Sequence, residues 1–194
     1  MLFRSPFALD RAVFRRDDAG IHCETEVLVS EEDDVEIRRL ALINRTLRSR
    51  TVDLTSYVEL SLAPHNADRQ HPAFNKLFVQ TEAVPQYGAL LAYRRSRHPD
   101  DPPAFVAHRL TPAVDAPLSF ETDRRVFIGR GRTLRDAMGA MQEPRNTQGY
   151  VLDPVLSLRR TLTLAPGERR QLSLVLAASE TRPAALDLMT QYSG

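Results

Sequence analysis

Three residue types are scarce in this chain of 194 residues, which has no tryptophan, one cysteine (Cys23) and one lysine (Lys76). A single cysteine excludes an internal disulfide and a cysteine-based metal cluster. The apolar runs are only a few residues long, far below the roughly 20 residues that a membrane-spanning helix needs. The first residues also lack the long apolar stretch of a secretory signal. We therefore expect a soluble, unexported protein.

Charge is nearly balanced, because 26 lysines and arginines face 25 aspartates and glutamates and the formal net charge is +1. No global field therefore draws the chain to nucleic acid or to an anionic membrane. Hydrophobic residues make up 42% and charged residues 26% of the sequence, as in an ordinary globular domain. We expect neither a nucleic-acid partner nor direct membrane insertion.

Alternation of apolar and polar residues dominates the chain and indicates β-strands. Val58, Leu60 and Leu62, for example, alternate with Glu59 and Ser61. Nowhere in the interior do apolar residues recur at helical spacing over ten or more positions. The sequence therefore predicts an all-β fold, one large antiparallel β-sandwich. Its ten expected strands lie at residues 12–16, 21–30, 35–44, 51–63, 76–82, 89–94, 105–110, 118–121, 155–164 and 171–177.

Two polar turns predict β-hairpins. Pro166 and Gly167 separate two alternating segments, and the pair favours a tight turn because proline pre-sets φ and glycine accepts a positive φ. The second turn, at 44–50, begins with Asn44-Arg45-Thr46, which matches a glycosylation sequon but is expected to be a plain turn. We expect the strands on either side of each turn to pair with each other.

The periodicity changes near the C-terminus. Thr181 can cap a helix, and Pro183 falls in its first turn. The chain is thus expected to divide into a sandwich at 1–180 and a C-terminal linker helix at 181–194. One face of this helix should dock on an apolar surface, the face formed by Ala185, Leu188, Met189 and Tyr192.

Motifs for self-contained catalysis are missing from the sequence. The five histidines are dispersed without an HExxH pattern, and no GxSxG elbow occurs. The acidic run at 31–34 lacks the spaced ligands and the glycine of a calcium loop, so it is expected to be a solvated turn. The stretch Gly129 to Arg132 approaches a phosphate-binding loop but lacks its spacing. We nominate no catalytic residue and expect no metal and no cofactor.

Five blocks of sequence resemble, in order, the N-terminal β-sandwich of glycoside hydrolase family 94, the sugar phosphorylases. The resemblance is to the version found inside bacterial cyclic β-1,2-glucan synthases. The blocks are EEDDVEIRRLALINRT (31–46), LTSYVEL (54–60), HPAFNKLFVQTE (71–82), FIGRGRTLRD (127–136) and VLDPVLSLRR (151–160).

This resemblance implies a galactose-mutarotase-like supersandwich fold with a short C-terminal helix. It also implies a parent enzyme that builds cyclic β-1,2-glucan, a glycosyltransferase with a phosphorylase-like region. In that region a catalytic (α/α)6 barrel, which carries the family's general acid, follows the sandwich and would be this chain's partner. The parent would be an inner-membrane protein with this region on the cytoplasmic side.

The stretch HPAFNKLF (71–78) is one candidate border of a sugar site. Asn75 and Lys76 offer polar contacts beside Phe74 and Phe78, as in sites where a ring packs on a sugar and polar groups bind its hydroxyls. The alternative is that both phenylalanines pack in the core or in an interface. We name Asn75 and Lys76 as candidate substrate-binding residues.

The Gly-Arg-Gly-Arg stretch is the other candidate. Arg130 and Arg132 can present planar donors to sugar hydroxyls or phosphate, and they complete the set of substrate-binding candidates. The alternative is a loop that forms salt bridges to the neighbouring barrel.

These expectations describe a non-catalytic, carbohydrate-associated module that supports the barrel, borders its glucan site and has β-1,2-glucan as a candidate ligand. The lack of tryptophan argues against strong sugar binding by the isolated domain. One alternative is a self-contained mutarotase-like carbohydrate enzyme, which needs His and Glu residues converging in a concave pocket as general acid and base. The other is a pure interdomain or dimerisation module, a homodimer through its barrel-facing surface.

Overall fold

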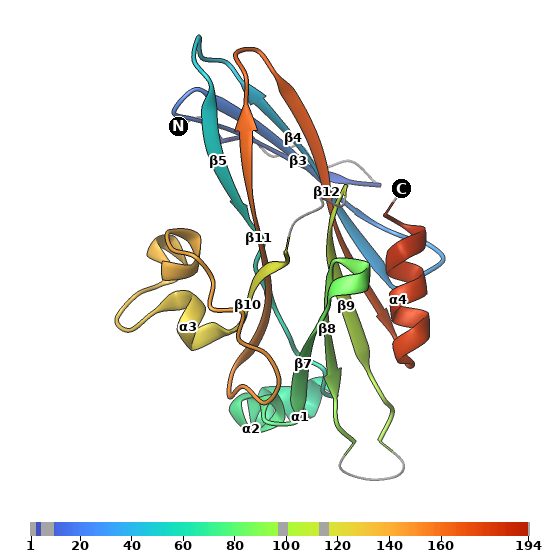
Figure 1. The fold of residues 1–194 in the computed structure, drawn as a ribbon. Helices are drawn as coiled ribbons and strands as arrows, with labels where there is room; N and C mark the ends of the chain where they lie inside the picture. The colour runs from blue at the N-terminus through green and yellow to red at the C-terminus, as the bar shows by residue number, and fades with distance from the viewer. Residues whose placement is uncertain (1–2, 5–9, 97–100, 113–116, 194) are drawn as a thin grey trace.

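The computed structural model describes the whole chain except residues 1–2, 5–9, 97–100, 113–116 and 194. Antiparallel strands form two sheets that face each other (Figure 1). The larger sheet has the strand order β1 (Phe3–Arg4), β2 (Ala12–Asp18), β3 (Ile21–Val29), β4 (Val35–Asn44), β12 (Arg169–Ser179), β9 (Phe105–Thr111), β8 (Ala89–Arg94), β7 (Val79–Val84). The smaller sheet has the order β10 (Ser119–Asp123), β11 (Pro154–Leu164), β5 (Arg50–Thr55), and β6 (Val58–Glu59) also pairs with β11. The predicted all-β sandwich is confirmed.

A leucine-rich core fills the space between the two sheets. Alternate residues of a strand point to opposite faces, so the even-numbered leucines of β11 all enter this core. The facing strands of the larger sheet contribute leucines in the same way, and the main members of the core are Leu40, Leu42, Leu90, Leu110, Leu156, Leu158, Leu162, Leu164, Leu172 and Leu174.

The opposite face of the larger sheet is covered by the C-terminal helix α4 (Arg182–Gln191) (Figure 1). Both faces of this sheet are therefore buried near β8, and the four residues 89–92 are completely inaccessible to solvent. The hydroxyl of Thr181 caps the helix by accepting from the amide of Ala184. As predicted, the apolar helix face docks on an apolar surface, which is the sheet of its own sandwich. Ala185, Leu186 and Met189 are buried there.

Neither predicted hairpin forms. The strands on either side of Pro166-Gly167 are β11 and β12, and they belong to different sheets. The same is true of β4 and β5, which flank the turn at 44–50. Alternation shows which residues face a core, but it does not show which strand is the hydrogen-bonding partner. Both turns instead carry the chain across the top of the sandwich, from one sheet to the other.

Asn44 fastens these two crossing turns to each other. Its side chain is fully buried, and its amide nitrogen donates to the carbonyl oxygens of Arg48, Leu164 and Ala165 at 2.8, 3.0 and 3.1 Å. Its amide oxygen accepts from the backbone and the hydroxyl of Thr46. The sequon asparagine is therefore a structural residue that closes one end of the sandwich.

Helices also occur in the interior of the chain, where none was predicted. Three short helices interrupt the strands, namely α1 (His65–Gln70), α2 (Pro72–Lys76) and α3 (Arg124–Ile128), together with 3-10 turns at Pro85–Tyr87, Leu134–Asp136 and Met138–Ala140. Helices of five or six residues are too short to display helical periodicity, which is why the pattern did not reveal them. Because α2 occupies 72–76, the strand expected at 76–82 begins only at Val79. In the described part of the chain, no helix combines the length and the apolar character needed to cross a membrane.

Candidate functional site

Residues 124–149, which we call the lobe, contain α3 and two 3-10 turns and lie beside the smaller sheet (Figure 1). At the end of the lobe, Gly149 bridges to Thr81 of β7 in the larger sheet. A small apolar cluster holds the lobe to this sheet. The rings of Phe127 and Tyr57 pack with centroids 4.8 Å apart. Gly139 approaches the Phe127 ring so closely that an added Cβ would lie 2.3 Å from a ring carbon. The contact therefore requires glycine at this position.

The buried carboxylate of Glu121 also fixes the lobe. One of its oxygens accepts from the backbone amides of Thr122 and Asp123, and the other accepts from the amide of Arg145 and the hydroxyl of Thr147. Four donors offset the cost of burying this group. The two ends of the lobe are thereby held together.

Arg159, on the outer face of β11, makes a third attachment. Its side chain is only 6% exposed, and it pairs with Asp53 at 2.8 Å. The same guanidinium donates to the carbonyl oxygens of Gly139 and Gln142 in the lobe. The lobe is thus built onto the sheet through both apolar and polar contacts.

An ion-pair network joins the lobe to α2. Lys76 pairs with one oxygen of Asp153 at 2.6 Å, and Arg124 approaches the other at 3.4 Å. Arg124 also donates to Glu59 and to the hydroxyl of Tyr57, each at 3.0 Å. Burial is the main cause that raises the pKa of Tyr57 to about 12, while the hydrogen bond from Tyr57 is the main cause of the lowered pKa of Glu59. Glu59 therefore stays ionised and Tyr57 stays protonated at neutral pH.

A hollow of about 780 Å³, which we call the arginine hollow, opens on the lobe. Its walls combine apolar side chains of α3 and the following turn with five arginines, namely Arg124, Arg125, Arg130, Arg132 and Arg145. Arg124 is neutralised by the network, and Arg132 donates to the carbonyl oxygen of Asp136 at 3.0 Å. Within the described residues, the guanidinium groups of Arg125, Arg130 and Arg145 meet no carboxylate and no hydrogen-bond acceptor. The hollow is therefore strongly cationic.

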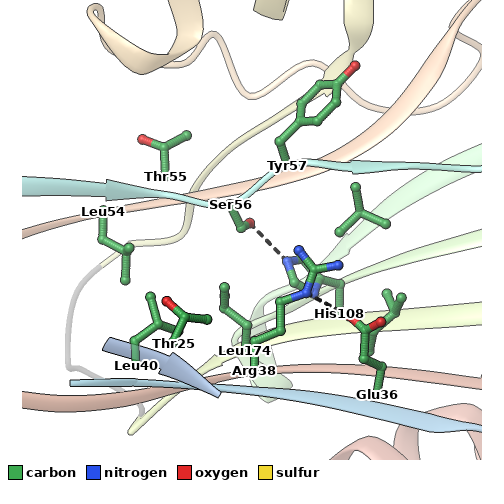
Figure 2. A pocket seen from close by; sticks show the side chains of 12 residues that line it. Thr25, Glu36, Arg38, Leu40, Leu54, Thr55, Ser56, Tyr57, His108 and Leu174 are labelled. Carbon is green, nitrogen blue, oxygen red and sulfur yellow. Dashed lines mark hydrogen bonds and ion pairs between the residues drawn. The ribbon is translucent and has the colours of Figure 1, made fainter. Parts of the chain in front are cut away.

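A second, smaller cavity of about 180 Å³ lies between the sheets (Figure 2). Ser56, where the strand predicted at 51–63 breaks, points into it and contacts His108 of β9, whereas Thr55 and Tyr57 point to the other side. Glu36 and Arg38 line the same cavity and pair at 2.7 Å. A histidine and a glutamate thus face one cavity, as the mutarotase-like alternative requires.

Hydrogen bonds determine the protonation state of His108. Its Nδ1 lies 3.1 Å from the carbonyl oxygen of Val175, which can only accept, so Nδ1 carries the proton. Its Nε2 then accepts from the hydroxyl of Ser56 at 2.9 Å, and that hydroxyl accepts from the amide of Leu158. Burial lowers the pKa of His108 to about 4. The imidazole is neutral and both of its nitrogens are engaged, which leaves it no free position for proton transfer.

Of the predicted site residues, Asn75 and Lys76 are both engaged within the fold. Asn75 is buried and donates to the carbonyl oxygens of Ala67 and His71, so it holds α1 against α2. Lys76 is the ion-pair partner of Asp153. Phe74 is 47% exposed and packs edge to face on Phe78.

Arg130 and Arg132 lie together in the arginine hollow, whereas Asn75 lines a different groove beside α1. The structure therefore divides the four candidates between two places. Sequence reasoning missed Arg124 and Asp153, which connect these places, and His108 with Ser56. A pair of complementary charges 29 positions apart gives no local signal, and neither does one histidine in an alternating strand.

Two solved structures share the sandwich fold of this chain. A putative aldose 1-epimerase from Escherichia coli superposes with a TM-score of 0.50 at 11% identity, covering 91% of this chain and 68% of that chain. A putative kojibiose phosphorylase from the human microbiome gives a TM-score of 0.52 at 8% identity, covering 94% of this chain and 20% of that chain. At such identities the likeness establishes the fold alone.

Residues 2–194 match the family described as glycosyl hydrolase 94, supersandwich domain, and the chain belongs to this family. It is 37% identical over 169 residues to cyclic beta-(1,2)-glucan synthase NdvB of Rhizobium meliloti, covering 84% of this chain and 6% of that protein. It is 27% identical to solabiose phosphorylase of Paenibacillus borealis, covering 87% of this chain and 21% of that enzyme. The chain thus spans a small part of the length of these relatives.

Proposed function

We propose that this domain is the non-catalytic, carbohydrate-associated sandwich of a cyclic β-1,2-glucan synthase. In this role it supports a catalytic barrel of the same parent chain and borders the glucan site of that barrel. The 37% identity to a glucan synthase supports the choice of parent. The chain covers 6% of that relative, and this small share favours an auxiliary role within a larger enzyme.

The observation that carries the non-catalytic part is the bonding state of the inter-sheet cavity. Its acid and base candidates are His108 and Glu36. Ser56 and the backbone of Val175 occupy both ring nitrogens of His108, while Arg38 neutralises Glu36. A general acid and base must reach the reacting group of the substrate. His108 and Glu36 are each already bonded to other groups of the fold, so they are poorly suited to that task.

Four exposed apolar side chains favour the presence of a docking surface at the end of the sandwich where α2 and residues 150–152 lie. They lie close in sequence to Lys76 and Asp153, which form an ion pair, and their exposed fractions are 47% for Phe74, 46% for Leu77, 78% for Tyr150 and 58% for Leu152. Rigid polar contacts with exposed apolar groups around them are typical of protein interfaces. We assign this surface to the barrel, because the curated phosphorylase relative is about five times as long as the matched region.

Titration with linear β-1,2-glucan tests the glucan-border role. We expect NMR signals around Asn75 and Arg130 to shift at millimolar glucan, while those of β12 stay constant. A linear β-1,3-glucan of the same length serves as the matched control and should shift them less. If no signal moves with either glucan, the domain is a scaffold without glucan contact.

The mutarotase-like alternative has one observation in its favour, the shared cavity of His108 and Glu36. Polarimetry of freshly dissolved glucose tests it directly. We expect the chain to leave the rate of mutarotation equal to that of buffer. A faster rate that Glu36→Gln abolishes would replace our proposal with a self-contained enzyme.

The dimerisation alternative concerns the isolated domain. The apolar face of α4 is buried on its own sheet and is not available to a homodimer, so we assign a homodimer interface to the barrel-facing surface. We further propose that the domain lies on the cytoplasmic side of an inner-membrane parent. Protease digestion of spheroplasts tests this placement, because the domain should be cut only after lysis.

A further inference from the structure

The arginine hollow has a charge that a neutral glucan does not explain. Five arginines line it, and none of the described residues that line it is acidic. Sugar hydroxyls can accept hydrogen bonds from guanidinium groups, but they do not neutralise them. Arg124 pairs with Glu59 and Asp153, but the other four guanidinium groups meet no carboxylate in the described residues, and a bound anion would reduce their mutual repulsion.

Most of the partly buried arginines of the described chain are matched inside the fold. Arg159 meets Asp53, and Arg182 meets Glu82. Arg160 donates to the carbonyl oxygens of Leu110 and Pro112. Arg125, Arg130 and Arg145 are exposed side chains that line one hollow, and they have no such partners in the described residues. Their guanidinium groups are therefore available to a ligand.

The backbone that presents these arginines is held in place. Thr133 and Asp136 form a reciprocal capping box at the turn after Arg132. Gly129 and Gly131 have φ values of 86° and 70°, which side chains other than glycine rarely adopt. The amide of Arg145 is bonded to the buried Glu121. Only the guanidinium groups need to adjust when an anion enters, so little backbone entropy would be lost.

We propose that the arginine hollow is an anion-binding site that takes a phosphate group. Phosphate has several acceptor oxygens, and planar guanidinium groups bind such oxyanions with paired hydrogen bonds. The volume of about 780 Å³ also leaves room for an organic group on the phosphate, against the apolar wall formed by Val126, Ile128, Leu134 and Met138. This site goes beyond the proposed glucan border and does not depend on it, because its ligand is charged.

Heteronuclear NMR of the intact chain, at constant ionic strength set with chloride, tests the site. Inorganic phosphate and glycerol phosphate are the two probes, and acetate is the carboxylate control. We expect saturable shifts at Gly129, Gly131 and neighbouring amides with at least one phosphate probe. A response to both probes identifies the phosphate group as the ligand chemistry, and a response to the ester alone means that the organic group is also required.

Matched variants localise the binding. Arg130→Gln and Arg145→Gln should each weaken phosphate binding about tenfold, because each removes a charge-assisted hydrogen bond. Arg169→Gln alters an exposed arginine on β12 and should leave the affinity unchanged. Equal weakening in all three variants, or saturation by acetate alone, would overturn the proposal, as would the lack of saturation with both phosphate probes. Acetate alone would instead indicate an acidic protein partner.

Discussion

The two sides of the smaller sheet differ in how their polar groups are bonded. On the inner side, Ser56 and His108 satisfy each other and the backbone. On the outer side, under and around the lobe, the hydroxyls of Thr55 and Ser157 and the Nε of Arg159 are buried without a hydrogen-bond partner in the described chain. Buried polar groups are normally bonded, so the exceptions mark places that water or a ligand completes. The polar groups named on the inner side are thus satisfied within the fold, whereas the three named on the outer side are not.

The largest effect on stability should come from Asn44, which satisfies groups at the closed end of the sandwich. Asn44→Ala leaves the buried carbonyl oxygens of Leu164 and Ala165 without donors. We expect the free energy of unfolding to fall by about 3 kcal/mol. Urea denaturation followed by circular dichroism measures it. The exposed Asn66→Ala is the control, and equal losses in both variants would contradict the role of Asn44.

His108 should make stability depend on pH. Its pKa falls from 6.5 to about 4 on folding, so the unfolded state binds the proton more readily between these values. The contribution of His108 to the free energy of unfolding is therefore constant above pH 6.5. It decreases as the pH falls toward 4, by about 3 kcal/mol in total. Denaturation at a series of pH values measures this slope.

Two histidine variants separate this slope from other titrations. His108→Gln should be less stable near neutrality but should lose most of the dependence between pH 6.5 and 4. His65→Gln, on the surface of α1, should keep the slope of the unaltered chain. A slope that survives in His108→Gln would mean that the imidazole is already charged or accessible in the folded protein.

Gly139 tests the attachment of the lobe on the outer side. Gly139→Ala places a methyl group against the Phe127 ring, and we expect a loss of about 2 kcal/mol from overpacking. Adding Phe127→Leu should recover part of this loss, because the smaller side chain makes room. Thermal denaturation of both single variants and the double variant completes the cycle. Simple additivity would contradict the close contact.

The smallest effect on stability should come from the barrel-facing surface. Tyr150→Asp and Leu152→Asp change exposed side chains, so the free energy of unfolding should shift by less than about 0.5 kcal/mol. Any self-association of the isolated domain should nevertheless decrease, as sedimentation velocity would detect. Leu47→Asp, at a side chain that is 95% exposed elsewhere, is the control. Dimers that persist in both surface variants would place the interface elsewhere.

The sequence predicted the strands well but not their partners. The bounds of β4 and β8 agree with the prediction at both ends, because alternation or continuous apolar character defines a strand locally. Pairing depends on which sheet the chain enters after a turn, and the two crossing turns are held together by bonds of Asn44 to residues about 120 positions away. Local patterns contain no such information.

The candidate site was predictable only in part. The glycine-arginine stretch was recognisable, and Arg130 and Arg132 do lie in a hollow. Lys76 and Asn75 were recognisable as polar residues between two phenylalanines. Their bonds to Asp153 and to the α1 backbone, however, depend on tertiary contacts. Arg145 joins the hollow because Glu121 holds its backbone there, which no spacing in the sequence reveals.

Phosphorolysis by the purified chain tests the central claim, a carbohydrate-associated domain without catalysis of its own. The chain would be incubated with linear β-1,2-glucan and inorganic phosphate, and glucose 1-phosphate would be measured enzymatically over several hours. We predict no release above a control without protein. Release that increases with the concentration of the chain and is lost in His108→Gln or Glu36→Gln would contradict the account.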